Sequence, residues 1–177
     1  MSKVKLYIAM SLDGKIAKLN DDVSWLDEIP NPDKSDYGYY SFYEKIETII
    51  MGNGTYKFIQ NMDIEFPYKG KRCYVLTRDR SLQDNIDVNF VSAEKSIELV
   101  AQLKKEEGGD NWLVGGGQAN TLFANNSLID EIIIHVIPIV IGDGIPLFGD
   151  RLNKKMLTLL SSKSYQSGVV ELIYGVL

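Results

Sequence analysis

Short apolar runs alternate with amphipathic segments along the first two thirds of the chain. This alternation is typical of strands that are connected by helices. The apolar runs predict strands over residues 4–10, 48–52, 72–77, 88–91 and 111–114, with a short continuation of the first at 15–17. Apolar residues at helical spacing predict helices over 36–47, from near Thr55, from the N-cap Ser92 to Gly108-Gly109, and over 118–124.

The last third of the chain has a different pattern. A long apolar run over 129–140 precedes a loop at 141–149 and two strands near 156–166 and 168–176. Together with the first part, this predicts an α/β fold whose central sheet is mostly parallel and ends in a C-terminal antiparallel hairpin. The chain has no repeat or low-complexity linker, so we expect a single domain spanning 1–177.

Charge and composition exclude several classes of function. The net charge is −5 and no basic stripe is present, which argues against nucleic acid and anionic membrane surfaces as partners. No apolar run has membrane-spanning length and no signal peptide is evident, so we expect a cytoplasmic protein. The chain has one cysteine, Cys73, and one histidine, His135, which argues against an internal disulfide or a metal cluster. His135 alternates with apolar residues, and we interpret it as a satisfied histidine of the sheet rather than a catalytic one, because no Ser–His–Asp arrangement can be assembled.

Three consecutive glycines, Gly115, Gly116 and Gly117, separate a predicted strand from a predicted helix in the stretch NWLVGGGQANTLF. In α/β sheets such corners lie at the carboxyl edge, where ligands usually bind, and a helix N-terminus there favours a phosphate. The stretch does not match the GxGxxG dinucleotide pattern. A phosphate site and a simple tight turn therefore both remain open.

Two further strand ends carry similar residues. Gly52 ends the strand at 48–52 and is followed by Asn53 and Thr55. The segment Leu76-Thr77-Arg78 lies at the end of the strand at 72–77. Taken alone, each is explained by a capped turn. Taken together, neighbouring strand ends with glycines, hydroxyls and an arginine are suited to one extended phosphorylated ligand.

Asp36 is the candidate acid, at the start of an aromatic-rich predicted helix. Its carboxylate either caps that helix or points into an apolar cleft, where burial would raise its pKa and suit it to donate a proton. In the second case Trp25, Tyr40 and Tyr43 would sandwich a flat substrate ring. The alternative for these aromatic residues is packing in the core.

Five blocks of the sequence resemble a known family. They are YIAMSLDGKIA (7–17), IIMGNGTY (49–56), YVLTR (74–78), WLVGGGQA (112–119) and VIGDGIPLF (140–148). In the same order, such blocks are found in the dihydrofolate-reductase-like family, and the chain is most similar to the reductase domain of the bifunctional riboflavin-biosynthesis deaminase-reductases. The resemblance covers essentially the whole chain and implies a three-layer fold with helices on both faces of the sheet.

The resemblance also implies a cofactor, NADPH, and a place for each part of it. Ala9 and Ile16 would flank the nicotinamide, and the pyrophosphate would meet Gly52, Asn53 and Thr55. Leu76, Thr77 and Arg78 would bind the adenosine and its 2′-phosphate. The central portion would lie against Gly115, Gly116, Gly117, Gln118 and Ala119, with a cis peptide between the first two glycines. The riboflavin-type reductases associate as homodimers, so the resemblance implies a homodimer, with the apolar strand at 129–141 and the terminal hairpin as the candidate interface.

Departures from the family pattern affect specificity. Asn53 replaces an arginine, so NADH is not excluded as the cofactor. Lys71 and Ile134 replace residues that contact folate in dihydrofolate reductases, so folate is a poor candidate substrate. The leading hypothesis is an NAD(P)H-dependent reductase of a small pterin- or pyrimidine-like heterocycle, with Asp36 as proton source. The alternative is a nucleotide-binding module without catalysis, such as a sensor or a sequestering protein.

Overall fold

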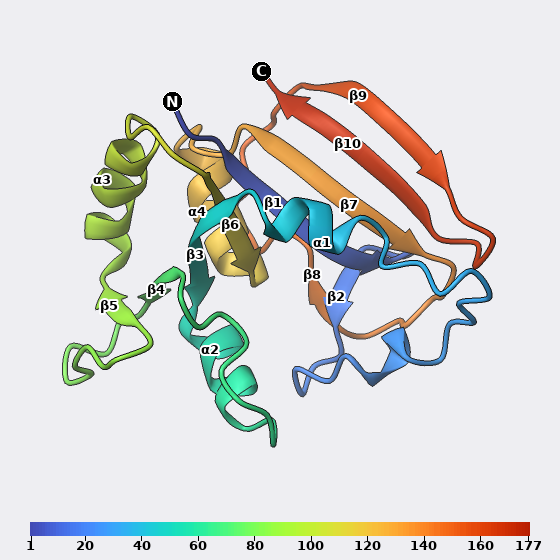
Figure 1. Cartoon of the computed structure of the whole chain (residues 1–177), viewed down its shortest axis with the longest axis horizontal. Helices are drawn as coiled ribbons and strands as arrows, with labels where there is room; N and C mark the ends of the chain where they lie inside the picture. The colour runs from blue at the N-terminus through green and yellow to red at the C-terminus, as the bar shows by residue number, and fades with distance from the viewer.

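One eight-stranded sheet organises the computed structural model, which describes all 177 residues (Figure 1). The spatial order of its strands is β5-β4-β3-β6-β1-β7-β10-β9. The strands are β1 (Val4–Ser11), β3 (Ile46–Gly52), β4 (Arg72–Leu76), β5 (Asn89–Val91), β6 (Asp110–Gly115), β7 (Glu131–Ile137), β9 (Leu157–Ser164) and β10 (Val170–Val176). Two short strands, β2 (Lys15–Ala17) and β8 (Ile145–Pro146), pair with each other in a separate ladder.

The sheet is parallel from β5 to β7 and antiparallel at its other side. β10 pairs antiparallel with both β7 and β9, which confirms the predicted C-terminal hairpin on a mostly parallel sheet. Because β1, β3, β4 and β6 run in the same direction, their carboxyl ends lie along one edge of the sheet. The corners identified in the sequence are therefore neighbours in space.

Helices cover both faces of the sheet, as the three-layer prediction required (Figure 1). They are α1 (Tyr39–Tyr43), α2 (Asn53–Gln60), α3 (Ala93–Leu103) and α4 (Gly117–Asn125), with a 3₁₀ turn at Ser24–Leu26. α3 and α4 pack on one face, and α1 and α2 pack on the other. Adjacent residues of β3 show the alternation that produces the two cores: Ile50 packs with α3 and α4, while Ile49 packs with α1 and α2.

The helix predicted over 36–47 is the largest error in the predicted elements. The observed α1 spans only Tyr39–Tyr43, and β3 begins at Ile46. The backbone N–H of Asp110 donates to the Lys45 carbonyl at 2.7 Å, and Ile46 pairs with Asp110 in the sheet. Strand pairing and burial of Ile46 therefore override the helical spacing of the aromatic residues before it.

The long apolar run at 129–140 also forms a shorter strand than predicted. β7 ends at Ile137 because the next residue, Pro138, has no N–H to donate to a ladder. No helix of the structure is both long enough and apolar enough to cross a bilayer.

Candidate functional site

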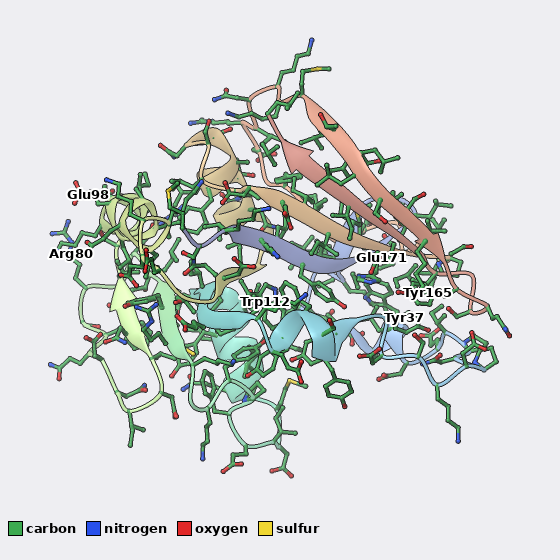
Figure 2. All side chains as sticks on the ribbon, turned by 45° about the horizontal axis from the view of Figure 1, so that its top comes forward. Tyr37, Arg80, Glu98, Trp112, Tyr165 and Glu171 are labelled. Atoms are coloured by element: carbon green, nitrogen blue, oxygen red, sulfur yellow. The ribbon has the colours of Figure 1, made fainter.

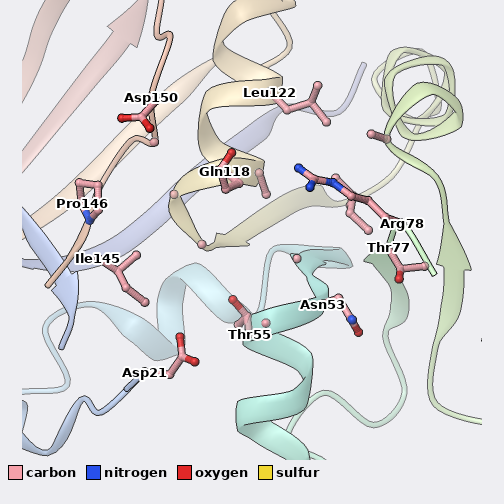
Figure 3. A pocket seen from close by; sticks show the side chains of 18 residues that line it. Asp21, Asn53, Thr55, Thr77, Arg78, Gln118, Leu122, Ile145, Pro146 and Asp150 are labelled. Carbon is pink, nitrogen blue, oxygen red and sulfur yellow. The ribbon is translucent and has the colours of Figure 1, made fainter. Parts of the chain in front are cut away.

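A cleft of about 550 Å³ lies at the carboxyl edge of β3, β4 and β6, between α2 and α4 (Figure 3). Most of the predicted cofactor-binding residues line it: Gly52, Asn53, Thr55, Leu76, Thr77, Arg78, Gly116, Gly117, Gln118 and Ala119. Three separate corners of the chain thus form one concave surface. Neighbouring strands bring them together, as the predicted parallel sheet required.

The N-termini of α2 and α4 both open on this cleft without a side-chain cap. α2 follows Gly52 and α4 follows Gly116, and neither glycine offers a side chain to the first-turn N–H groups. In contrast, the hydroxyl of Ser92 accepts a hydrogen bond from the Lys95 N–H at the start of α3. Two unsatisfied helix N-termini carry partial positive charge, which suits an anionic group such as a pyrophosphate.

The three glycines at the centre of the cleft serve different purposes. Gly115 has φ +117°, a conformation that residues with side chains rarely adopt, and its peptide bond to Gly116 is cis, as the resemblance implied. At Gly117, an added Cβ would lie 2.5 Å from the carbonyl oxygen of Pro146, so only glycine allows this close approach. A Cβ at Gly116 would lie 3.8 Å from Thr55 Oγ1, in the cleft itself. The glycine run therefore combines a required backbone conformation, close packing and open binding space.

One end of the cleft has a cationic side chain that no carboxylate neutralises. Arg78 lies beside Thr77 at this end (Figure 3), and it forms no ion pair within the protein. The Oδ1 atom of Asn53 is also here, buried and without a hydrogen-bond partner. A free guanidinium at this end is suited to a ligand with a phosphate group.

The opposite end of the cleft contains residues that were not predicted from the sequence. Asp21, Ile145, Pro146 and Asp150 form this wall (Figure 3). The last three belong to or follow the block VIGDGIPLF, which supported the resemblance but was not assigned to the site. Asp21 lies in a polar segment without periodicity, so no local signal identified it.

The remaining predicted cofactor residues lie behind the cleft lining. Gly115 is buried, while the Cδ1 atom of Ile16 is 4.0 Å from the position of a Cβ on Gly116. Ala9 packs against the cluster of Trp25, Ile137 and Val169 on the α1 side of the sheet. Ile16 thus lies close to Gly116 of the cleft, and Ala9 lies on the sheet beyond it.

Asp36 does not have the environment that a proton donor would need. Its carboxylate is exposed and accepts hydrogen bonds from the N–H groups of Gly38 and Tyr40, both at 3.0 Å. The bond from Tyr40, followed by that from Gly38, lowers the pKa of Asp36 below its ordinary value. Asp36 therefore caps the start of the helix, and the alternative in which burial raises its pKa is wrong.

The predicted aromatic sandwich is not formed either. Trp25 is 1% exposed and packs with Ile137 and Val169, which is the core-packing alternative. Tyr40 is 70% exposed, and the hydroxyl of Tyr43 donates to the Pro67 carbonyl at 3.4 Å. None of the three lines the cleft.

The chain is similar to known proteins over nearly its whole length. The family model of the RibD C-terminal domain matches residues 2–171. The uncharacterised protein YwjB of Bacillus subtilis (strain 168) is 40% identical over 167 residues, which are 94% of each chain. The crystal structure of a putative riboflavin biosynthesis protein from Shewanella sp. PV-4 superposes with a TM-score of 0.85 at 27% identity, over 100% of this chain and 99% of that one.

A dihydrofolate reductase shares the fold. The enzyme of Enterococcus faecalis, solved with NADP(H), superposes with a TM-score of 0.66 at 14% identity, over 98% of this chain and 96% of that one. The resemblance to reductases that the sequence blocks indicated is therefore confirmed at the level of family and fold.

Proposed function

The chain belongs to the RibD C-terminal domain family, and from this premise we propose that it is an NADPH-dependent reductase of a small pterin- or pyrimidine-like heterocycle. The observation that carries the proposal is the cleft between the two uncapped helices. Its centre is bare backbone with two helix N-termini, and one end holds the unpaired Arg78. This arrangement is complementary to an elongated ligand with phosphates at its middle and at one end.

Each part of the cleft has a role in this proposal. The N–H groups at the starts of α2 and α4 would hold the pyrophosphate. Thr55 and Gln118 face each other across the cleft there (Figure 3). Leu76 and Thr77 hold the adenosine. Ile16 and Ala9 would hold the nicotinamide end. When bound, the cofactor supplies the hydride, while the chain orients the two reactants and keeps water out.

Arg78 favours NADPH over NADH within the proposal. The guanidinium forms a planar, permanently charged fork that binds a phosphate with two parallel hydrogen bonds. It has no carboxylate partner in the protein that would compete for those donors. The 2′-phosphate, which NADH lacks, is the group that would use them.

A nucleotide-binding module without catalysis is the second candidate. The replacement of the family arginine by Asn53 is the observation that favours it, because one cationic contact to the phosphates is lost. Both candidates bind the nucleotide, so only turnover separates them.

The test is a titration with NADPH and with NADH, followed by the fluorescence of Trp25 and Trp112. We expect saturable quenching with tighter binding of NADPH. Incubation of the complex with a panel of pterins and pyrimidines should then oxidise the nucleotide, which is followed by its absorbance. No saturation by either nucleotide would contradict both candidates, whereas binding without oxidation across the panel would favour the second.

A homodimer completes the proposal. β9 forms one edge of the sheet and pairs only with β10, so its outer backbone groups are unpaired. All eight residues of β9 are exposed, and Leu159 and Leu160 are 53% and 56% exposed. An edge strand with exposed leucines in its first half is suited to pairing with a second copy of the chain.

A further inference from the structure

A row of residues in register crosses the sheet beside Ala9. Ala9 of β1 pairs with His135 of β7, and His135 pairs with Glu171 of β10. Paired residues point to the same face, and neighbouring strands lie about 5 Å apart. His135 is thus one strand away from Ala9, the residue placed against the nicotinamide by the proposed function. Glu171 is one strand further.

The row lies beneath the segment that leads into α1. His135 is 4% exposed, and its Nε2 atom lies 3.0 Å from the Tyr37 carbonyl oxygen and 3.2 Å from Glu171 Oε2. The Tyr7 hydroxyl donates to the same Tyr37 carbonyl at 3.2 Å. Figure 2 shows Tyr37, Tyr165 and Glu171 grouped together, away from Glu98 on α3.

The two contacts of Nε2 determine where the imidazole carries its proton. A backbone carbonyl and an ionised carboxylate are both acceptors, so Nε2 must be the donor in this arrangement. The other ring nitrogen, Nδ1, has no hydrogen-bond partner in the protein. His135 therefore has one nitrogen that is fixed by two acceptors and one nitrogen without a hydrogen-bond partner.

Ionisable groups surround His135 on three elements of the fold: β10, β1 and the turn after β9. Glu171 contributes a carboxylate from β10, and Tyr7 from β1 stays neutral because burial raises its pKa. Tyr165, in the turn after β9, also has a raised pKa through burial, and Lys163 and Asp36 lie near that ring. Burial lowers the pKa of His135 below its ordinary value, against the opposing effects of Glu171 and the Tyr37 carbonyl. Burial thus favours the neutral imidazole of His135, with its proton on Nε2.

We propose that His135 supplies the proton of the reduction through Nδ1, and that Glu171 is a positioning residue that holds its ring. This inference rests on the proposed function and assigns to His135 the role once considered for Asp36. A bound nicotinamide cofactor would supply the hydride to the carbon of a C=N or C=O group. The heteroatom takes the proton from Nδ1 of the imidazolium, the N–H electron pair stays on Nδ1, and neutral His135 is reprotonated from solvent. A histidine at this distance from Ala9 serves a flat heterocycle that extends across β7.

The first experiment observes the imidazole directly, because His135 is the only histidine of the chain. Protein labelled with ¹⁵N-histidine is titrated with acid by NMR. We expect the Nε2–H tautomer at neutral pH and protonation of Nδ1 below the ordinary histidine pKa. Glu171→Gln should lower this pKa further, while the exposed, unpaired Glu98→Gln should leave it unchanged. The Nδ1–H tautomer, or a pKa insensitive to Glu171→Gln, would overturn the proposal.

The second experiment measures hydride transfer in a single turnover with NADPH and the substrate found in the pterin and pyrimidine panel. We expect the wild-type rate to fall as pH rises through the lowered pKa of His135. His135→Gln should reduce the rate roughly 100-fold, the typical effect of a general acid, and should remove this pH dependence. Glu171→Gln should move the pH dependence to lower pH, and it provides the test if His135→Gln fails to fold.

The outcomes separate this inference from the function on which it rests. NADPH affinity, measured by tryptophan fluorescence, should be the same in wild type and His135→Gln. A wild type that reduces substrate while His135→Gln keeps both its rate and its pH profile would overturn only the role of His135. A wild type that binds no nucleotide would overturn the reductase function and the proton donor together.

Discussion

The Nδ2 atom of Asn120 donates a hydrogen bond to the Leu147 carbonyl at 2.7 Å, and this bond joins α4 to the loop that forms the far wall of the cleft. Asn120 is completely buried, so its amide is inaccessible to water. Removal of the donor would leave the Leu147 carbonyl without this partner.

Asn120→Ala should therefore lower the free energy of unfolding by about 1–3 kcal/mol. It should also weaken nucleotide binding, because the loop at 145–150 loses one of its hydrogen bonds to α4. Urea unfolding and NADPH titration check the two effects. Asn126→Ala is the control, since Asn126 bonds only to Leu122 within the same helix and lies at its exposed end. Equal stability of Asn120→Ala and wild type would show that the bond is not important for the fold.

Gly117→Ala should destabilise the protein. The new Cβ would lie 2.5 Å from the Pro146 carbonyl oxygen and 3.3 Å from the Gly149 nitrogen, which are backbone atoms. Moving them costs about 1–3 kcal/mol, the usual cost of overpacking. In Gly54→Ala, nothing lies within 4 Å of the new Cβ, so stability should be retained. Thermal unfolding of the two variants gives the comparison, and equal melting temperatures would contradict the close approach at Gly117.

Arg78→Gln should weaken the binding of NADPH about tenfold or more, because a hydrogen bond to a charged group contributes roughly 1.5–3 kcal/mol. NADH binding should change little, since NADH has no 2′-phosphate. Arg80→Gln is the matched control, because Arg80 is exposed, forms no ion pair and does not line the cleft. Fluorescence titration measures all three proteins. If the binding of NADPH and the binding of NADH were weakened equally, Arg78 would contact a part of the cofactor other than the 2′-phosphate.

Asp36→Ala should lower stability in a way that depends on pH. The folded protein holds the pKa of Asp36 below its unfolded value of 3.8, so its contribution to stability is present above that value and is lost as pH falls through the folded pKa. The free energies of unfolding of wild type and variant should therefore differ at neutral pH and become equal in strong acid. Urea unfolding at the two pH values measures both. Unchanged NADPH affinity is expected. A constant difference at all pH values would argue against capping by the ionised carboxylate.

Leu159→Lys should convert the proposed dimer into a monomer. A lysine on an edge strand opposes pairing with another strand, and Leu159 lies in the middle of β9. Leu19→Lys is the control, because Leu19 is equally apolar and 73% exposed but lies outside the hairpin. Sedimentation of the three proteins gives their masses. A wild type that sediments only as a monomer at working concentration would dispose of the interface.

Much of the fold and of the cleft could be predicted because the relevant signals are local. Apolar runs such as 48–52 and 111–114 identify strands, and glycines at their ends identify corners with special backbone conformations. A mostly parallel sheet then requires those corners to meet at one edge. The positions of Gly52, Arg78 and Gly116 in a single cleft follow from these two facts.

The surroundings of polar side chains could not be predicted in this way. Asp36 and His135 illustrate the difficulty, because each pattern is compatible with two environments. Local turn geometry gives Asp36 two N–H donors and keeps it in solvent. Strand pairing places Glu171, far away in the sequence, beside His135 and leaves one ring nitrogen free.

By itself, then, the order of apolar runs, helical patterns and glycine corners determined the α/β architecture and the edge of the sheet at which a ligand would bind. Only the tertiary structure decided that α1 is short, that Trp25 belongs to the core and that Glu171 meets His135. The physical reason is the range of the interactions. Backbone conformation and periodicity depend on a few adjacent residues, whereas burial and the pKa of a side chain depend on segments that only folding brings together.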